Sequence, residues 1–189
     1  MAGLPPQDQE ILTDHAEATV EVVGSMADIS ASQWDSCANP DPATHNPFVS
    51  HAFLQALEEA ETVSPRTGWQ PQHLIIKDDN DIIRGCMPLY AKSHSKGEYV
   101  FDYGWADAFE RAGGSYYPKL VSAVPFTPVP GRRILVQPGE DADSYENLLL
   151  AGAIELTGRY DLSSLHINFL PEQQWSDTKE MGFLQRMDQ

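Results

Sequence analysis

The sequence contains little cysteine and few basic residues. Its 189 residues include two cysteines, and Lys plus Arg number 12 against 28 for Asp plus Glu, which gives a formal net charge of −16. Cys37 and Cys86 are too few and too far apart for a disulfide framework, so we expect reduced thiols in the cytoplasm. The excess of carboxylates repels phosphate backbones and anionic membrane surfaces, which argues against a nucleic-acid partner.

Several patterns that carry known chemistry are also missing. No window approaches the roughly 18 apolar residues of a membrane span. The histidines and cysteines lack the short spacing of a zinc site, which predicts no metal. A G-x-S-x-G elbow and a G-x-G-x-x-G after a strand are both absent, which argues against hydrolases and dinucleotide-binding folds.

The first sixteen residues differ in composition from the rest. They are rich in Pro, Gln, Asp and Glu and have no basic region or long apolar core, so we expect a disordered leader over 1–16. The remaining residues, 17–189, have the length of one domain, and a chain with 41% hydrophobic residues can bury a core.

Hydrophobic periodicity predicts alternating strands and helices. Ser30 and Gln33 form a capping box at one helix start, Ser50 can cap a second helix, and Asp143 with Glu146 resembles a third cap. The expected elements are, in order, a strand at 18–25, helices at 30–38 and 51–61, a hairpin at 72–93, a strand at 98–104, a short helix at 105–112, a helix at 144–160, a strand at 163–170, a helix at 171–181 and a strand from 183.

The stretch "AGGSYYPKLVSAVPFTPVPGRRILV", residues 112–136, is too broken for a helix and too rich in proline for a central strand. Each proline fixes its own φ and restricts the residue before it, so the stretch could form a stiff wall for a ligand. Alternatively, its prolines protect a sheet edge from pairing with other chains, and its lysine is solvated beside core tyrosines.

The order of the elements is that of the Gcn5-related N-acetyltransferase (GNAT) superfamily. Within it, "DTKEMGFLQR" (177–186) resembles the closing helix, glycine and strand of that superfamily. More specifically, "NPFVSHAFLQALEEAETVSPRTGWQPQHLII", "GCMPLYAKSHSKGEYVFDYGWADAFERAGGSYYPKL" and "LHINFL" look like a bacterial family of predicted N-acyltransferases related to peptidoglycan-bridge aminoacyltransferases. The resemblance covers roughly residues 46–189 and only the N-terminal half of the family's two tandem domains.

The resemblance implies an α/β (α+β) fold with a mixed, mostly antiparallel sheet flanked by helices. It also implies transfer of an acyl group from a CoA thioester or aminoacyl carrier to the amine of a small molecule or peptide. In that reading this chain is the acceptor-binding half, and its partner is either a C-terminal GNAT-like domain or a second copy. The alternative is a substrate-binding or interaction module that is not catalytic.

One segment departs from the superfamily pattern. An active GNAT domain carries Q/R-x-x-G-x-G/A before the helix whose N-terminus holds the pyrophosphate. Here the segment is "PVPGRRILVQPGEDADSY", in which Gly131 and Gly139 lack that spacing and Glu140, Asp141 and Asp143 stand near the phosphate position. We therefore assign no cofactor-binding residue and no tightly bound cofactor, and leave acyl-CoA as a co-substrate of the full-length protein.

Acyl transfer to an amine needs a base for the amine proton and often an acid for the leaving group. Candidates for the base are Glu98, Asp102, Glu110 and His166, and those for the acid are Tyr103, Tyr116 and Tyr117. We select Asp102, Tyr117 and His166 as candidate catalytic residues. The candidate substrate-binding residues are Ser50, His51, Trp105, Tyr116, Lys119, Phe126, Thr127 and Pro128.

Overall fold

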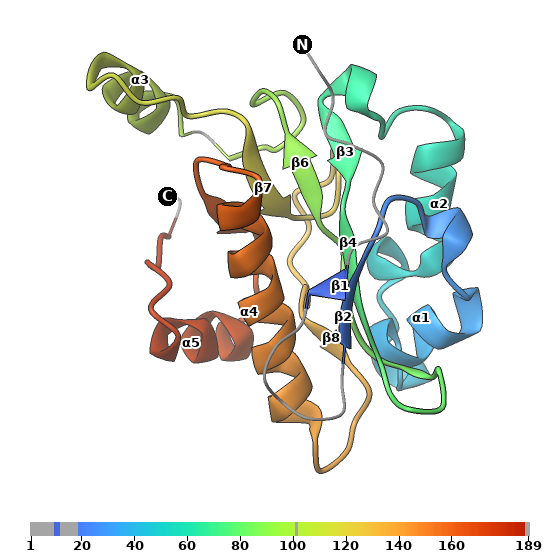
Figure 1. Cartoon of the computed structure of the whole chain (residues 1–189). Helices are drawn as coiled ribbons and strands as arrows, with labels where there is room; N and C mark the ends of the chain where they lie inside the picture. The colour runs from blue at the N-terminus through green and yellow to red at the C-terminus, as the bar shows by residue number, and fades with distance from the viewer. Residues whose placement is uncertain (1–9, 12–18, 101, 188–189) are drawn as a thin grey trace.

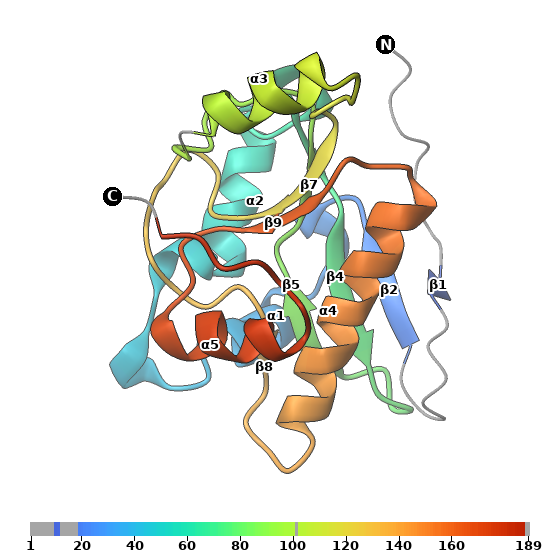
Figure 2. The same cartoon turned by 90° about the vertical axis from the view of Figure 1, so that its left-hand side faces the viewer.

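A computed structural model describes residues 10–11, 19–100 and 102–187 of the chain. In it, α1 and α2 cover one face of a sheet layer and α4 and α5 the other, while α3 projects from one end (Figures 1 and 2). The elements are β1 (Glu10–Ile11), β2 (Thr19–Val23), α1 (Ala31–Ala38), α2 (His51–Glu59), β3 (Trp69–Pro71), β4 (His73–Lys77), β5 (Ile83–Met87), β6 (Tyr90–Lys92), α3 (Tyr103–Arg111), β7 (Lys119–Ser122), β8 (Leu135–Val136), α4 (Ala142–Arg159), β9 (Leu165–Ile167) and α5 (Glu172–Glu180).

A single long hairpin joins two sheets, whose strand orders are β1-β2-β4-β5-β8 and β3-β6-β7-β9. Trp69 pairs with Lys92 in the second sheet and Leu74 with Met87 in the first, so the register is unchanged from one sheet to the other. Between them the Gln72 N–H donates to the Leu89 carbonyl. All of these strand pairs are antiparallel except β7 with β9, which is parallel.

The proline-rich stretch leaves this arrangement and returns to it. Tyr90 pairs with Val121, and Cys86 pairs with Leu135. The two hairpin residues are four positions apart in the sequence, whereas their partners are fourteen positions apart. Residues 123–134 are therefore an excursion between two strands that lie opposite the same hairpin. Contrary to expectation, part of the proline-rich stretch, Lys119–Ser122, is itself a central strand. This is possible because the prolines of the stretch lie outside those four residues.

Two large apolar cores fill the layers, and a smaller one of Val63, Trp69 and Tyr90 lies at the β3–β6 end. One large core lies between α4 and the sheet, and the other lies between α1, α2 and the sheet. Gly152 allows the close approach of α4, because a Cβ at this position would lie 2.9 Å from Val20 Cγ1. These cores hold the hairpin in place and so position everything that extends from it.

The helices are predicted well, and their caps less so. All five expected helices are present, and the Ser50 side chain accepts a hydrogen bond from Phe53 N–H as predicted. At α1, Ser30 is the N-cap but makes no side-chain cap, and Gln33 does not complete the capping box because its side chain accepts a hydrogen bond from Ile83 N–H on β5. At α4 the predicted cap is wrong, since the helix begins at Ala142 after Asp141.

The strand expected at 98–104 is wrong. Tyr99 adopts a positive φ of 56°, and α3 begins at Tyr103. The reason is a shared partner: Glu98 and Asp102 both contact Lys119, whereas residues four apart on an extended strand lie about 13 Å apart. Residues 183–187 likewise form no strand where one was expected, after Gly182 ends the helix with a φ of 86° as anticipated.

The predicted leader lies largely outside the described residues. Its described part, Glu10–Ile11, pairs with Val20 and Glu21 of β2. The remaining strand predictions are confirmed in position. β2 and β9 fall within the expected ranges, with β9 shorter than expected, and the hairpin overlaps its expected range but begins three residues earlier, at Trp69.

Candidate functional site

A cluster of charged side chains is buried beside β7. Lys119 Nζ lies 2.9 Å from Glu98 Oε2 and 3.0 Å from Asp102 Oδ2, and all three side chains are at most 1% exposed. Burial raises the pKa of Glu98, against the pull of the Lys119 ammonium. Burial also acts to raise the pKa of Asp102, but hydrogen bonds from Tyr116 and Lys119 outweigh it, so that this pKa lies below its ordinary value.

Two tyrosines complete this cluster. Tyr116 OH donates to Asp102 Oδ2 at 2.5 Å, and Tyr117 OH donates to Glu98 Oε1 at 3.5 Å. Burial and the nearby carboxylates raise the pKa of both phenols, so each remains a proton-bearing donor at neutral pH. Asp102 Oδ1 is buried without a hydrogen-bond partner among the described residues, which leaves one acceptor atom open.

A second lysine faces the first across the strands. Lys92 is directly paired with Lys119, and its Nζ donates to the Lys96 carbonyl at 3.0 Å and lies 3.8 Å from the centre of the Trp69 ring. Burial lowers the pKa of Lys92 to about 8, although the Glu98 carboxylate opposes this effect. Like charges opposite each other destabilise a strand pair, and Glu98 offsets that repulsion.

His166 connects the charged cluster to a pocket. Its ring centre lies 6.1 Å from that of Tyr116, and its Nε2 is 2.9 Å from the Ser164 hydroxyl oxygen. Burial and the Lys119 ammonium lower the pKa of His166 to about 4, so the imidazole is neutral at pH 7. A neutral imidazole can accept a hydrogen bond, but this pKa makes it a weak base.

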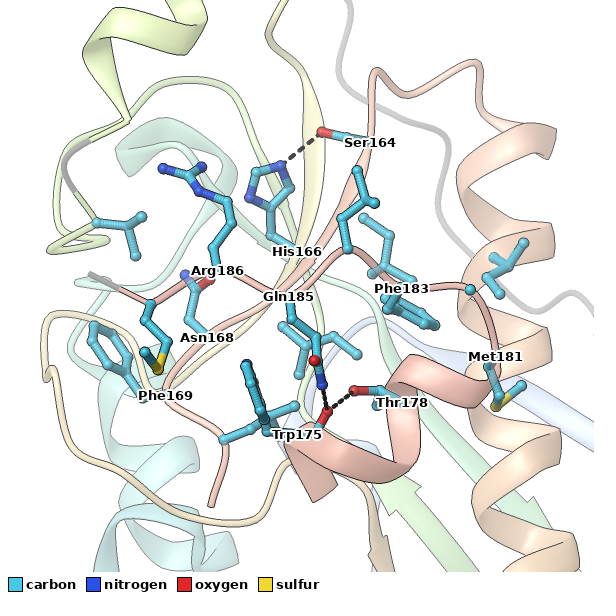
Figure 3. A pocket seen from close by; sticks show the side chains of 18 of the residues that line it. Ser164, His166, Asn168, Phe169, Trp175, Thr178, Met181, Phe183, Gln185 and Arg186 are labelled. Atoms are coloured by element: carbon cyan, nitrogen blue, oxygen red, sulfur yellow. Dashed lines mark hydrogen bonds between the residues drawn. The ribbon is translucent and has the colours of Figure 1, made fainter. Parts of the chain in front are cut away.

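The pocket lies between β9, α5 and the segment that follows α5, and it has a volume of about 970 Å³. Figure 3 shows His166 and Arg186 extending to the same side of it, with Trp175 and Gln185 on the side of α5. Apolar side chains make up much of the lining. Besides Trp175, they are Val100, Ile154, Leu165, Ile167, Phe169, Leu170, Met181, Phe183, Leu184 and Met187. Such a site suits a ligand with an apolar part and a few polar groups.

The structure brings together five of the predicted site residues. Asp102, Tyr116, Tyr117 and Lys119 lie in the buried cluster, and His166 stands beside it at the pocket. The predicted wall is corrected, however, because the pocket is lined by residues 164–187 with Val100 and Ile154, and not by 112–131.

The other predicted residues lie elsewhere. His51 is buried, with Nε2 within hydrogen-bonding distance of the Met26 and Ile29 carbonyls, and Ser50 OH donates to the Pro47 carbonyl. Phe126 packs on Trp69, whose ring also contacts the Lys92 ammonium. Thr127 and Pro128 follow it in the excursion, and Trp105 is 65% exposed on α3, with the Arg186 guanidinium 5.5 Å from its ring centre.

Sequence reasoning missed two polar residues that shape the excursion. The buried Arg133 guanidinium donates to the carbonyls of Val129, Gly131 and Arg132, which satisfies acceptors in a segment where prolines remove the donors. Gln174 of α5 accepts from Arg133 N–H and donates to the Ile134 carbonyl. An isolated glutamine in a polar run such as "PEQQW" gives no signal that it is buried.

The N-terminus of α4 is acidic, as the sequence indicates. Asp141 and Asp143 stand in or next to its first turn, and Glu140 precedes them. These carboxylates complement the positive end of the helix dipole. Within the described ranges, no group of three or more His, Cys, Asp or Glu side chains is arranged to hold a metal ion.

Comparison with protein families gives a match over residues 25–189 to the FemAB-like family, described as peptidoglycan biosynthesis/recognition. The chain belongs to this family. A comparison of the FemAB-like chain with curated proteins gives no match.

Two solved structures share the fold of this FemAB-like chain. An acetyltransferase from Trypanosoma brucei has 13% identity and a TM-score of 0.51, with 91% of this chain and 96% of that one covered. The aminoglycoside antibiotic 6'-N-acetyltransferase AAC(6')-Ih from Acinetobacter baumannii has 15% identity and a TM-score of 0.50, with 90% and 93% covered. The expected GNAT-like fold is thus confirmed. In the part of the chain that the structure describes, no helix is both long and apolar enough to cross a membrane.

Proposed function

We propose that this FemAB-like domain is the acceptor-binding half of an N-acyltransferase, and that the pocket along β9 holds an amine-bearing part of a peptidoglycan peptide. The observation that carries this proposal is the position of His166, which lies at the pocket wall and next to the Tyr116–Asp102–Lys119 cluster. Amine acylation requires a site that receives a cation and then handles a proton, and carboxylates serve the first need.

The reaction in question forms a bond between the amine nitrogen and the acyl carbon, while the bond from that carbon to its carrier breaks. The bound ammonium first gives one proton to solvent, which frees its lone pair. The proton lost when the new bond forms passes to the carrier, which leaves as a thiol or hydroxyl. We assign His166, which lines the pocket, to accept a hydrogen bond from the amine. Asp102 and Tyr117 lie in the cluster behind His166, and we assign Asp102 to favour positive charge in the pocket by its own negative charge and Tyr117 to hold the cluster by its hydrogen bond to Glu98. These roles agree with an ionised Asp102, a neutral imidazole and a protonated phenol at pH 7.

The same proposal assigns the acyl donor to a site outside this domain. Beside β8, Arg133 N–H and the Ile134 carbonyl could form hydrogen bonds with the amide-bearing arm of a CoA thioester. Both groups, however, are already hydrogen-bonded to the Gln174 side chain. The acidic start of α4 also disfavours the phosphates of CoA.

Isothermal titration calorimetry tests both parts. A peptidoglycan stem pentapeptide with a lysine at its third position should bind, and the same peptide with that lysine Nε-acetylated should bind about tenfold more weakly, because the cation is lost. Acetyl-CoA should show no binding at micromolar concentrations. Equal affinity for the free and acetylated amine would contradict acceptor binding, and micromolar binding of acetyl-CoA would contradict the donor assignment.

Two glutamates of α5 provide a matched pair of variants. Glu172 lines the pocket, whereas Glu180 is exposed at the other end of the helix. Glu172→Gln should weaken binding of the free-amine peptide several-fold, and Glu180→Gln should leave it unchanged, because only the first carboxylate can face the bound cation.

A further inference from the structure

The outer edge of β9 is unpaired within the described residues. β9 ends the strand order β3-β6-β7-β9 and pairs with β7 alone. On the β7 side, Leu120 N–H donates to the Ser164 carbonyl and Asn168 N–H donates to the Ser122 carbonyl. Since alternate residues of a parallel strand bond to one neighbour, the N–H and C=O groups of Leu165 and Ile167 face the other way.

The pocket runs along this unpaired edge. Ser164 through Leu170 line one side of it, and Gly182 through Met187 line another. Figure 2 shows this last segment passing close to β9, and the structure assigns it no strand. Its main-chain bonds outside helices and strands run back to α5, from Gly182 N–H to the Lys179 carbonyl and from Phe183 N–H to the Thr178 carbonyl. Among the described residues, the segment therefore makes no main-chain bond to the β9 edge.

We infer that a short extended peptide binds in this pocket by adding a strand to the outer edge of β9. This inference rests on the proposed function and specifies how the acceptor is held: by its main chain on Leu165 and Ile167, with side chains towards apolar lining such as Trp175 and Phe183. Strand addition of this kind draws affinity from main-chain hydrogen bonds, and selects side chains through the pockets alongside.

Charge and length favour a cationic peptide over a second copy of the chain. The net charge of −16 repels another copy and attracts a basic ligand. The ionisable side chains of the lining are Glu172, His166 and Arg186, of which His166 is neutral at pH 7 and Arg186 reaches to the Trp105 ring. β9 has three residues, which is enough to register a short peptide but offers little area for a stable dimer.

Two backbone-methylated peptides test the inference. A basic, all-L pentapeptide with a central lysine is made in two forms, each N-methylated at alternate main-chain amides, and the binding of each is compared with the unmethylated parent by calorimetry. Only alternate amides of an added strand face β9, so one form should bind about tenfold more weakly and the other within about twofold of the parent. If both forms bind like the parent, or both lose binding equally, strand addition is wrong.

The comparison with Nε-acetylated lysine separates this inference from the function it rests on. If the acetylated peptide binds as well as the parent while one methylated form fails, strand addition holds and amine recognition does not. If acetylation abolishes binding while both methylated forms bind normally, the amine site holds and strand addition is overturned.

A change on the protein gives an independent test. Ile167→Pro removes the outward N–H, which an edge strand tolerates, and should weaken peptide binding about tenfold. Unchanged affinity in a folded variant would contradict the inference. Should the variant not fold, hydrogen exchange on the wild-type protein decides: the Ile167 amide should exchange at least about tenfold more slowly with peptide bound, while the Leu120 amide, already bonded to Ser164, serves as the control. Protection of Ile167 without peptide would mean that the chain's own 183–187 segment occupies the edge.

Discussion

The two ends of the long hairpin lie in unlike surroundings. At the β4–β5 end, residues such as Ile75 and Ile76 enter apolar cores on the two faces of the sheet. At the β3–β6 end, the neighbouring strand pair places Lys92 opposite Lys119, and both are fully buried. The register is continuous, so the difference comes from the side chains and from what packs on them.

This difference shows where the domain carries its function. Apolar burial stabilises a fold without directing chemistry, whereas buried ions cost desolvation free energy, and a well-packed apolar group could often replace them at no loss. The charged end also adjoins the pocket, through His166 and Val100. We therefore expect substitutions at the charged end to alter binding, and those at the apolar end to alter stability alone.

Replacing Lys119 should have the largest effect on stability. Lys119→Met leaves the buried carboxylates of Glu98 and Asp102 without their cation, and should lower the free energy of unfolding by about 3–5 kcal/mol. Lys92→Met is the matched control: it removes one hydrogen bond and a cation–π contact, and its lost attraction to Glu98 is offset by the lost repulsion from Lys119, so it should cost about 1 kcal/mol. Urea denaturation measures both, and equal losses would contradict the distinction between the two lysines.

At the apolar end, the effect should be nearly as large but confined to stability. Leu149 of α4 is fully buried, and Leu149→Ala should cost about 2–5 kcal/mol through lost burial and the cavity left behind. Peptide affinity, measured where the variant remains folded, should stay within about twofold of wild type. A large loss of affinity would mean that the two ends are coupled more strongly than their contacts suggest.

The apolar end is also the part that sequence could predict. Alternation in "ATVEVV" and helical spacing in "NLLLAGAIEL" identify elements whose partners are any apolar surface, so the pattern alone suffices. The charged end depends on particular partners. Nothing local indicates that Glu98 and Asp102 turn back to one lysine on a later strand, so the strand expected there was wrong.

The site was predicted in part for a similar reason. The tyrosines and the lysine of "GGSYYPKL" were singled out by their chemistry, and the structure gathers them with Asp102. The prediction that residues 112–131 border the pocket differs from the pocket described above. A high proline content indicates that a segment is stiff, but it does not indicate on which side of the sheet the segment lies. Gln174 was missed because its role depends on backbone groups forty residues away.

A smaller effect should follow from removing Gln174, which ties the helical layer to the excursion. Gln174→Ala leaves Arg133 N–H and the Ile134 carbonyl without partners, and should cost about 1–3 kcal/mol in urea denaturation. The neighbouring Gln173 is exposed and bonds only to Asp177 one turn along, so Gln173→Ala should cost about 0.5 kcal/mol or less. A similar small loss for both variants would show that the excursion does not depend on α5.

The pH dependence of stability should also separate the two ends. His166 has a pKa of about 4 in the folded domain, against about 6.5 in an unfolded chain. Above pH 6.5 both states hold it neutral, and it has no effect. As the pH falls from 6.5 towards 4, the unfolded chain takes up a proton that the folded domain does not, so this residue lowers the free energy of unfolding progressively. His166→Gln should therefore flatten the stability profile between pH 6.5 and 4, as followed by urea denaturation at several pH values. If His166→Gln keeps the wild-type dependence of stability on pH, another group causes the loss of stability in acid. The neutral state assigned to His166 in the pocket would then be wrong.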